Sequence, residues 1–211
     1  ILEYLTEEVL QQQPESIQTF LVQTAILDRL CGPLCDAVLL GPAEKHNLSG
    51  RKTGAQGSGL RPGLPEQEAQ GEGYRTLEAL EAANLFIVPL DDQRSWYRYH
   101  HLFSDFLRHR LRREMPELVP ELHRRASDWF EANDLIPEAV DHALAAGDLQ
   151  RAADLIEWTA WRVLARGEMI TLLAWLDRLP PSVVRSRPQL GVLRAWALAL
   201  SGEIERIEPC L

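Results

Sequence analysis

The sequence lacks the features that define membrane proteins, disulfide-rich proteins and most nucleic-acid-binding proteins. Its 211 residues contain no run of about 20 apolar residues, the length that a membrane-spanning helix needs. Three cysteines in a chain of this size exclude a disulfide framework and suit a reducing compartment. Lys and Arg (22) are outnumbered by Asp and Glu (31), and the net charge of −9 argues against a chain whose main task is holding nucleic-acid phosphates. We therefore expect a cytoplasmic protein with no membrane partner.

Sequence signatures of catalysis are also missing. There is no Gly-x-Ser-x-Gly elbow and no His-Glu-x-x-His pair. Gly54 and Gly59 have the spacing of a phosphate-binding loop, but Leu60 and Arg61 stand where that loop needs Lys and Ser or Thr. We therefore expect this chain to be no enzyme and to hold no cofactor of its own.

Two cysteines lie close enough to raise the question of a metal site. Cys31 and Cys35 are four residues apart and could share one helical face. Two thiolates without two further ligands cannot complete a tetrahedral zinc site, whereas free cysteine is among the most buried residue types. We expect both side chains to pack in the core, and no metal ligands.

Large apolar residues are scarce in one segment, 41–73. Eight of the 13 glycines and three prolines fall there, so the segment offers little surface to bury against its ordering entropy. The composition predicts a long, flexible, glycine-rich loop over 41–73.

The rest of the chain reads as mainly helical with one hairpin. Helical patterns precede the loop in 2–10, 17–25 and 34–40, and after it a helix (76–84), two strands (85–90 and 96–99) and another helix are expected. Residues assigned to the inner face of that last helix are Leu102, Phe103, Phe106, Leu107 and Leu111. Helices followed by a single hairpin are the order of a winged helix, which is predicted over residues 1–113.

From residue 114 to 211 the sequence predicts a helical repeat. Asn133-Asp134, Gly167-Glu168 and Gly202-Glu203 are turn signals spaced 34 and 35 residues apart. Each follows an apolar helix and precedes another, with second helices expected at 139–144, 172–179 and 204–211. This recurrence is typical of tetratricopeptide-like arrays. We expect the array to be truncated at its C-terminus, and the start at Ile1 rather than Met predicts a piece of a longer protein.

A winged helix raises the possibility of DNA binding, but the residues argue against it. The helix that would enter the major groove carries Arg75, Glu78 and Glu81, and its acidic balance would be repelled by phosphate. The basic run 108–113 lies at a helix end, where cations usually form a solvated face.

The most informative polar pair is His100-His101, where the second strand meets the next helix. Backbone N–H groups at a helix start can bind an anion, and an adjacent imidazole could donate a further hydrogen bond to phosphate. The alternative is a histidine that caps the helix and packs beneath the wing. The residues alone favour this second interpretation.

Five segments, residues 30–38, 80–91, 96–103, 122–130 and 139–148, together resemble the middle of MalT-type regulators. These are the large ATP-binding members of the LuxR-type transcriptional activators. The resemblance spans nearly the whole chain and departs from the family at the long loop, where relatives usually have a short connection.

The resemblance implies a division of labour within a longer protein. It implies an ATPase domain of the STAND class upstream, with ATP or ADP as the cofactor of the parent, and a DNA-binding helix-turn-helix downstream. Related STAND proteins end their winged helix in a Met-His-Asp motif whose histidine touches the phosphates of ADP. His100 occupies the matching place, with His101 as the alternative, although the Met and the Asp are both replaced.

The leading hypothesis is a non-catalytic regulatory segment of an ATP-dependent transcriptional activator. It would couple the nucleotide state of the upstream domain to a helical array that binds a small-molecule or protein effector, and DNA would be bound only through the missing C-terminal domain. The alternative is a tetratricopeptide-like adaptor for protein–protein interaction, in which the winged helix only caps the array.

Overall fold

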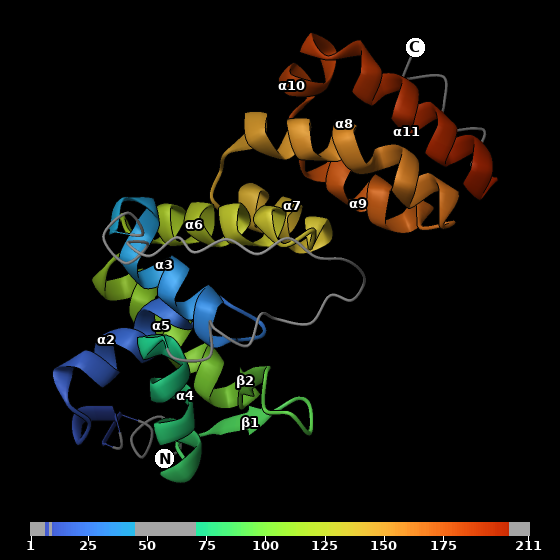
Figure 1. The fold of residues 1–211 in the computed structure, drawn as a ribbon. Helices are drawn as coiled ribbons and strands as arrows, with labels where there is room; N and C mark the ends of the chain where they lie inside the picture. The colour runs from blue at the N-terminus through green and yellow to red at the C-terminus, as the bar shows by residue number, and fades with distance from the viewer. Residues whose placement is uncertain (1–6, 9, 45–70, 203–211) are drawn as a thin grey trace, which may run out of the picture. The chain divides into compact units, whose positions relative to one another are not determined.

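The computed structural model describes residues 7–8, 10–44 and 71–202, and the chain divides into two compact units, 1–126 and 127–211. The first unit contains α2 (Glu15–Thr24), α3 (Gly32–Glu44), α4 (Glu72–Ala82), β1 (Ile87–Pro89), β2 (Tyr97–Tyr99) and α5 (His101–Glu114) (Figure 1). The division falls inside α6 (Val119–Ala132), so this helix contributes residues to both units. The domain boundary predicted from the sequence, near residues 113–116, lies between α5 and α6.

The second unit is entirely helical in its described part. It contains the end of α6 and then α7 (Ile136–Ala145), α8 (Leu149–Ala165), α9 (Met169–Arg178), α10 (Pro181–Ser186) and α11 (Pro188–Ser201). This order of elements confirms the predicted fold class, a winged helix with one hairpin followed by a helical array. No helix among the described residues has the length and hydropathy of a membrane span.

The core of the first unit forms where α2 packs against α3 and α5, and α3 packs against α4. Its fully buried side chains come from each of these helices and include Leu21, Leu34, Leu77, Leu80 and Leu107. Cys31 and Cys35 are also fully buried, which confirms their predicted packing role. Burial is the main reason that the pKa of the Cys35 thiol is raised well above its usual value.

The hairpin is joined by a third extended segment that the sequence did not reveal. Ile87 pairs with Tyr99 and Pro89 with Tyr97 in an antiparallel ladder. On its other side, Tyr97 exchanges two backbone hydrogen bonds with Leu30, at 2.7 and 2.8 Å. Leu30 lies between α2 and α3, so the pairing ties the wing to the helical part of the unit.

Both ends of the loop predicted over 41–73 belong instead to helices. The segment 41–44 belongs to α3, which changes direction at Gly41 (φ 67°), and residues 72–73 begin α4. Gly73 is buried, and its N–H donates a 2.7 Å hydrogen bond to the carboxylate of Asp36. A Cβ at Gly73 would lie 2.5 Å from the carbonyl oxygen of Gly32, so this glycine permits close contact between α3 and α4. The rest of the predicted loop, 45–70, lies outside the described residues, as does most of the helix predicted over 2–10.

One assignment on α5 was wrong. Phe103, Leu107 and Leu111 are buried as predicted, and Phe106 is half-buried, but Leu102 is exposed. Leu102 lies in the first turn of α5, beside the histidine pair, and so belongs to the surface around the candidate site.

Several helices of the second unit end in left-handed turns, whereas α9 and α10 do not. The three predicted turn positions each carry a positive φ: Asp134 (57°), Gly167 (77°) and Gly202 (81°). The unit also contains one short helix that the repeat did not predict, α10, which begins at Pro181. The expected final helix, 204–211, lies outside the described residues.

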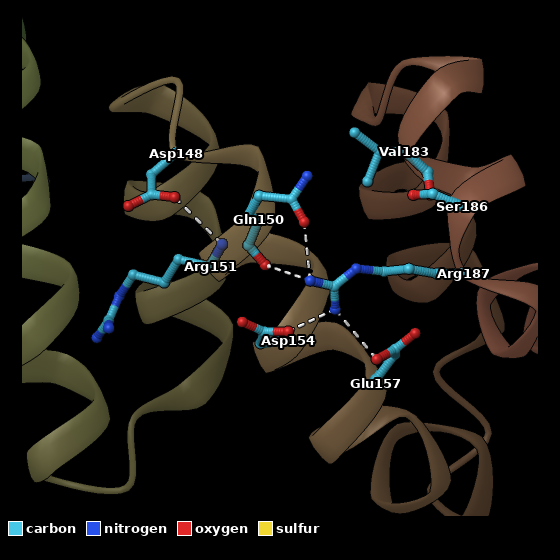
Figure 2. Close-up of polar contacts among 8 residues, drawn as sticks. All are labelled: Asp148, Gln150, Arg151, Asp154, Glu157, Val183, Ser186 and Arg187. Atoms are coloured by element: carbon cyan, nitrogen blue, oxygen red, sulfur yellow. Dashed lines mark hydrogen bonds and ion pairs between the residues drawn. The ribbon is translucent and has the colours of Figure 1, made fainter.

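Arginine bridges link helices of this unit that do not follow each other directly in the sequence. Arg187, between α10 and α11, donates to Asp154, to Glu157 (3.2 Å) and to the side-chain oxygen of Gln150 (2.9 Å), all on α8 (Figure 2). The Asp154 carboxylate raises the pKa of the Arg187 guanidinium, so the side chain is firmly charged. Similar bridges join Arg151 to Asp128 and Glu131, Arg178 to Asp141, and Arg194 to Asp177.

Candidate functional site

The candidate site lies at the junction of the wing and α5. His100 is the residue before the helix: its N–H donates to the carbonyl of Phe86 (2.7 Å), and its own carbonyl accepts from Ser104 (2.9 Å). The backbone of His100 is thus fixed by the hairpin on one side and by the helix on the other. Its side chain remains exposed to solvent.

The two imidazoles lie side by side. The ring centroids of His100 and His101 are 4.4 Å apart, with the planes tilted by 35°, and both residues are exposed. No side chain caps the start of α5, so neither histidine has the buried capping role that the residues alone favoured. The phosphate contact of His100, or of His101, remains a prediction.

A buried tyrosine holds this junction in place. The hydroxyl of Tyr99 is 2.7 Å from the hydroxyl of Thr24, which in turn donates to the carbonyl of Phe20 (2.6 Å). The Tyr99 ring also makes an edge-on contact with Phe103, with centroids 5.9 Å apart. Burial raises the pKa of the Tyr99 hydroxyl, which stays neutral. The residue immediately before His100 is therefore fixed to α2 and to α5.

A pocket of about 320 Å³ opens beside the histidines. Its lining comes from the α2–α3 connection, both strands and α5, and it comprises Leu27, Asp28, Val88, Arg98, Tyr99, His100, His101, Ser104, Asp105 and Arg108. The first-turn N–H groups of α5 lie at this junction, and no side chain caps them. Two imidazoles, Arg98 and the start of α5 favour an anion in this pocket, whereas Asp105 disfavours one and Arg108 is paired with Asp28.

One of the two arginines in the lining, Arg108, is bonded to other residues of the first unit. The Nε of Arg108 donates to the carbonyl of Ala25 (2.7 Å), and one terminal nitrogen bonds Asp28 (2.6 Å). Arg108 thus closes the end of α2 and neutralises Asp28. The other arginine, Arg98, projects from the exposed face of β2.

The helix that would read DNA in other winged helices is α4, and its surface is acidic. Glu72 and Glu78 are exposed beside Arg75, and Glu81 forms an ion pair with Arg94 of the wing (3.2 Å). The mixed, mainly acidic surface agrees with the expectation that this helix does not contact DNA phosphates. Within 7–8, 10–44 and 71–202, no three potential metal ligands cluster. Gly54 and Gly59, which have the spacing of a phosphate-binding loop, lie outside these ranges.

Three tryptophans, which we call the exposed tryptophans, lie on the helical array. They are Trp158 and Trp161 on α8 and Trp196 on α11, each more than half exposed. The guanidinium of Arg162 lies 4.5 Å from the ring centre of Trp158. The repeat spacing explains the pattern, since Trp161 and Trp196 each stand six residues before a turn glycine, Gly167 and Gly202. The apolar helices expected before the turns at Gly167 and Gly202 include Trp161 and Trp196, but the apolar pattern did not predict that these side chains are exposed.

The architecture defines a class: a winged helix whose α4 has a mainly acidic surface, followed by a helical array. A family model described as "MalT winged helix domain" matches residues 6–55 and 62–119. The chain therefore belongs to the MalT winged-helix family, as its sequence motifs had suggested.

The similarity to known proteins extends beyond the winged helix, and the matching proteins are of two kinds. The chain is 37% identical over its whole length to the serine/threonine-protein kinase PknK of Mycobacterium tuberculosis, and equally to PknK of Mycobacterium bovis. It is 32% identical over 92% of its length to the HTH-type transcriptional regulator MalT of Yersinia enterocolitica. The chain spans only 17% of PknK and 18% of MalT.

Proposed function

We propose that this chain is a non-catalytic regulatory segment that couples the nucleotide state of an ATPase domain in the same protein to a helical array that binds an effector. The observation that carries the proposal is the exposed His100, fixed at the start of α5 and lining an anion-compatible pocket. A nucleotide held by a neighbouring domain would present its phosphates to this pocket. ADP would then favour a closed state, and effector and ATP an open one.

The two kinds of relative support a regulatory rather than an output role. A protein named as a kinase and another named as a transcriptional regulator both contain this segment, although their outputs differ. A segment common to both proteins can therefore regulate either a kinase or a DNA-binding domain. We favour a transcriptional activator as the parent, with DNA bound through a separate C-terminal domain.

The identity of 37% to PknK over the whole chain favours a second candidate, in which the same segment regulates a kinase. Sequencing the complete gene distinguishes the two, because a kinase domain and a C-terminal helix-turn-helix are recognisable from sequence. A gene with neither, and without an ATPase domain, would favour the adaptor alternative. In that case the exposed tryptophans would be the first candidates for contact with a partner.

The coupling proposal is tested by His100→Ala in the full-length protein. Loss of one charge-assisted hydrogen bond to phosphate should weaken ADP binding about tenfold and raise activity in the absence of effector. ADP affinity by calorimetry and the basal output of the protein are the two measurements. His109→Ala is the matched control, since His109 is also exposed on α5 but does not line the pocket.

The same experiment includes His101→Ala, because both imidazoles line the pocket. If only His101→Ala weakens ADP binding, the phosphate contact belongs to His101. Unchanged ADP affinity and basal output in both variants would contradict the proposed coupling.

A further inference from the structure

The helices of the first unit form a groove that shares no lining residue with the pocket beside His100. It lies between α2, α3 and α4 and has a volume of about 490 Å³. Its apolar lining consists of Ile17 and Phe20 on α2 and of Leu39 and Leu40 on α3. Leu40 is 41% exposed, so part of this apolar surface is in contact with solvent.

Three carboxylates line the same groove: Glu15 on α2, Asp36 on α3 and Glu72 on α4. Within the part of the chain that the structure describes, none of the three forms an ion pair, and no Lys, Arg or His lines the groove. The fold tolerates this negative charge because Glu15 and Glu72 occupy the first positions of their helices, where the helix dipole favours an anion. The groove is therefore both apolar and uncompensated in charge.

Asp36 is the carboxylate that gains most from a counter-charge. It is half-buried, and one of its oxygens accepts the N–H of Gly73 at 2.7 Å. Burial, and to a lesser extent the negative charge of Glu72, raises the pKa of the Asp36 carboxyl, whereas the hydrogen bond from Gly73 opposes this shift. A cation beside Asp36 would offset the hydration that this carboxylate loses on burial.

We propose that the groove between α2, α3 and α4 binds a basic segment of a partner protein, with one arginine or lysine side chain seated among the three carboxylates. Arginine and lysine combine a charged head with an apolar stem, so one side chain satisfies both parts of the lining. An inorganic cation would leave the apolar lining uncovered. An apolar ligand would bury the carboxylates without a counter-charge, which costs free energy.

The test measures how a labelled hexapeptide of alternating Arg and Leu binds to the full-length protein, by fluorescence anisotropy at about 0.15 M salt, where distant charges are screened. Asp36→Asn should weaken binding about tenfold, because it removes the charge but keeps an acceptor for the N–H of Gly73. Leu40→Ser should weaken binding about threefold, since apolar contact is lost. Glu78→Gln is the control: it makes the same change in charge on α4 outside the groove, and its effect should stay below about twofold. Melting temperatures equal to that of the wild type verify that each variant folds.

Weaker binding with Asp36→Asn and Leu40→Ser, and a silent Glu78→Gln, would support the proposal. Equal losses with Asp36→Asn and Glu78→Gln, and none with Leu40→Ser, would show that the peptide responds only to net charge and would overturn it. Binding that appears only after Arg51→Ser and Lys52→Ser would assign the groove to basic residues of the chain itself. Binding that dissociates a dimer would assign it to a second copy, and either result would also overturn the proposal.

Discussion

The two units of the chain are stabilised in different ways. In the first unit, side chains connect residues far apart in the sequence: Thr24 meets Tyr99, 75 residues away, and Arg125 donates to the carbonyl of Val38, 87 residues away. In the second unit the bridges span about one repeat or less, as between Arg187 and Asp154, 33 residues apart. The first unit is thus a single tertiary fold, whereas the second resembles a series of neighbouring modules.

Glycine shows the same difference. In the first unit Gly32 and Gly73 are required because two helices approach so closely that neither position has room for a Cβ. In the second unit Gly167 and Gly202 have open space around them but adopt positive φ at helix ends. Replacing a packing glycine forces the two helices apart, because the added side chain has no room. Replacing a turn glycine causes only local backbone strain.

The largest effect that this comparison predicts is that of Gly73→Val. A side chain at position 73 must displace the carbonyl of Gly32 or the carboxylate of Asp36, and we expect a loss of about 3 kcal/mol in the free energy of unfolding. Hydrogen exchange followed by peptide should locate the loss in residues 10–44 and 71–126.

The matched control for that prediction is Gly167→Ala. Its Cβ meets no atom within 4 Å, so only the positive φ is unfavourable, and the expected loss is about 1 kcal/mol, confined to the second unit. If both variants lost the same stability, the distinction between packing and turn glycines would be wrong.

The second prediction is a pH dependence in the first unit. Burial, with the nearby Arg108 and Arg112, lowers the pKa of His123 to about 4, while Asp28 opposes this shift. Below the unfolded-state pKa of about 6.5, His123 is protonated in the unfolded chain, whereas in the folded chain it stays neutral until about pH 4. Stability should therefore fall as the pH falls from 6.5 to 4, by less than about 3 kcal/mol because the ring is partly exposed.

Unfolding free energies at pH 7 and pH 4.5 test this dependence against His123→Gln. The variant should lose less stability than the wild type between the two pH values, since its side chain does not titrate. Parallel losses in the two proteins would show that other groups cause the acid sensitivity.

The smallest expected effect is that of Arg187→Gln. The guanidinium bonds Asp154 and Glu157 on α8 but lies near solvent, so its removal should cost about 1 kcal/mol. Hydrogen exchange should rise in α8, α10 and α11 and stay unchanged in the first unit. Arg185→Gln is the control, because Arg185 is exposed on α10 and bonds none of these acids. A rise that spread into residues 10–44 and 71–126 would contradict the independence of the two units.

Sequence patterns predicted the helices and the hairpin because their apolar periodicities are local. They missed the pairing of Leu30 with Tyr97, since one bridging residue leaves no alternation to detect. Gly73 was assigned to the loop because composition cannot distinguish a loop glycine from one that allows helices to approach. The helix α10 was missed because consecutive prolines, Pro180 and Pro181, favour a break as well as a helix start.

The candidate site was predictable only in part. His100 was identified by its position between a strand and a helix, which the sequence pattern preserves. Arg98 and Asp105 were not, because the pocket that they share with Leu27 and Asp28 exists only after the α2–α3 connection has packed against the hairpin and α5. Charged residues on separate elements come to line one pocket only through the fold.

Hydrogen exchange at the first turn of α5 tests most directly whether this junction senses nucleotide phosphates, when it is measured in the full-length protein with ADP, with ATP and without nucleotide. We expect ADP to slow exchange at the amides of Leu102 and Phe103 beside His100, ATP to slow it less, and His100→Ala to abolish the difference. Equal exchange at these amides under all three conditions would contradict the claim that this junction senses the phosphates of the nucleotide.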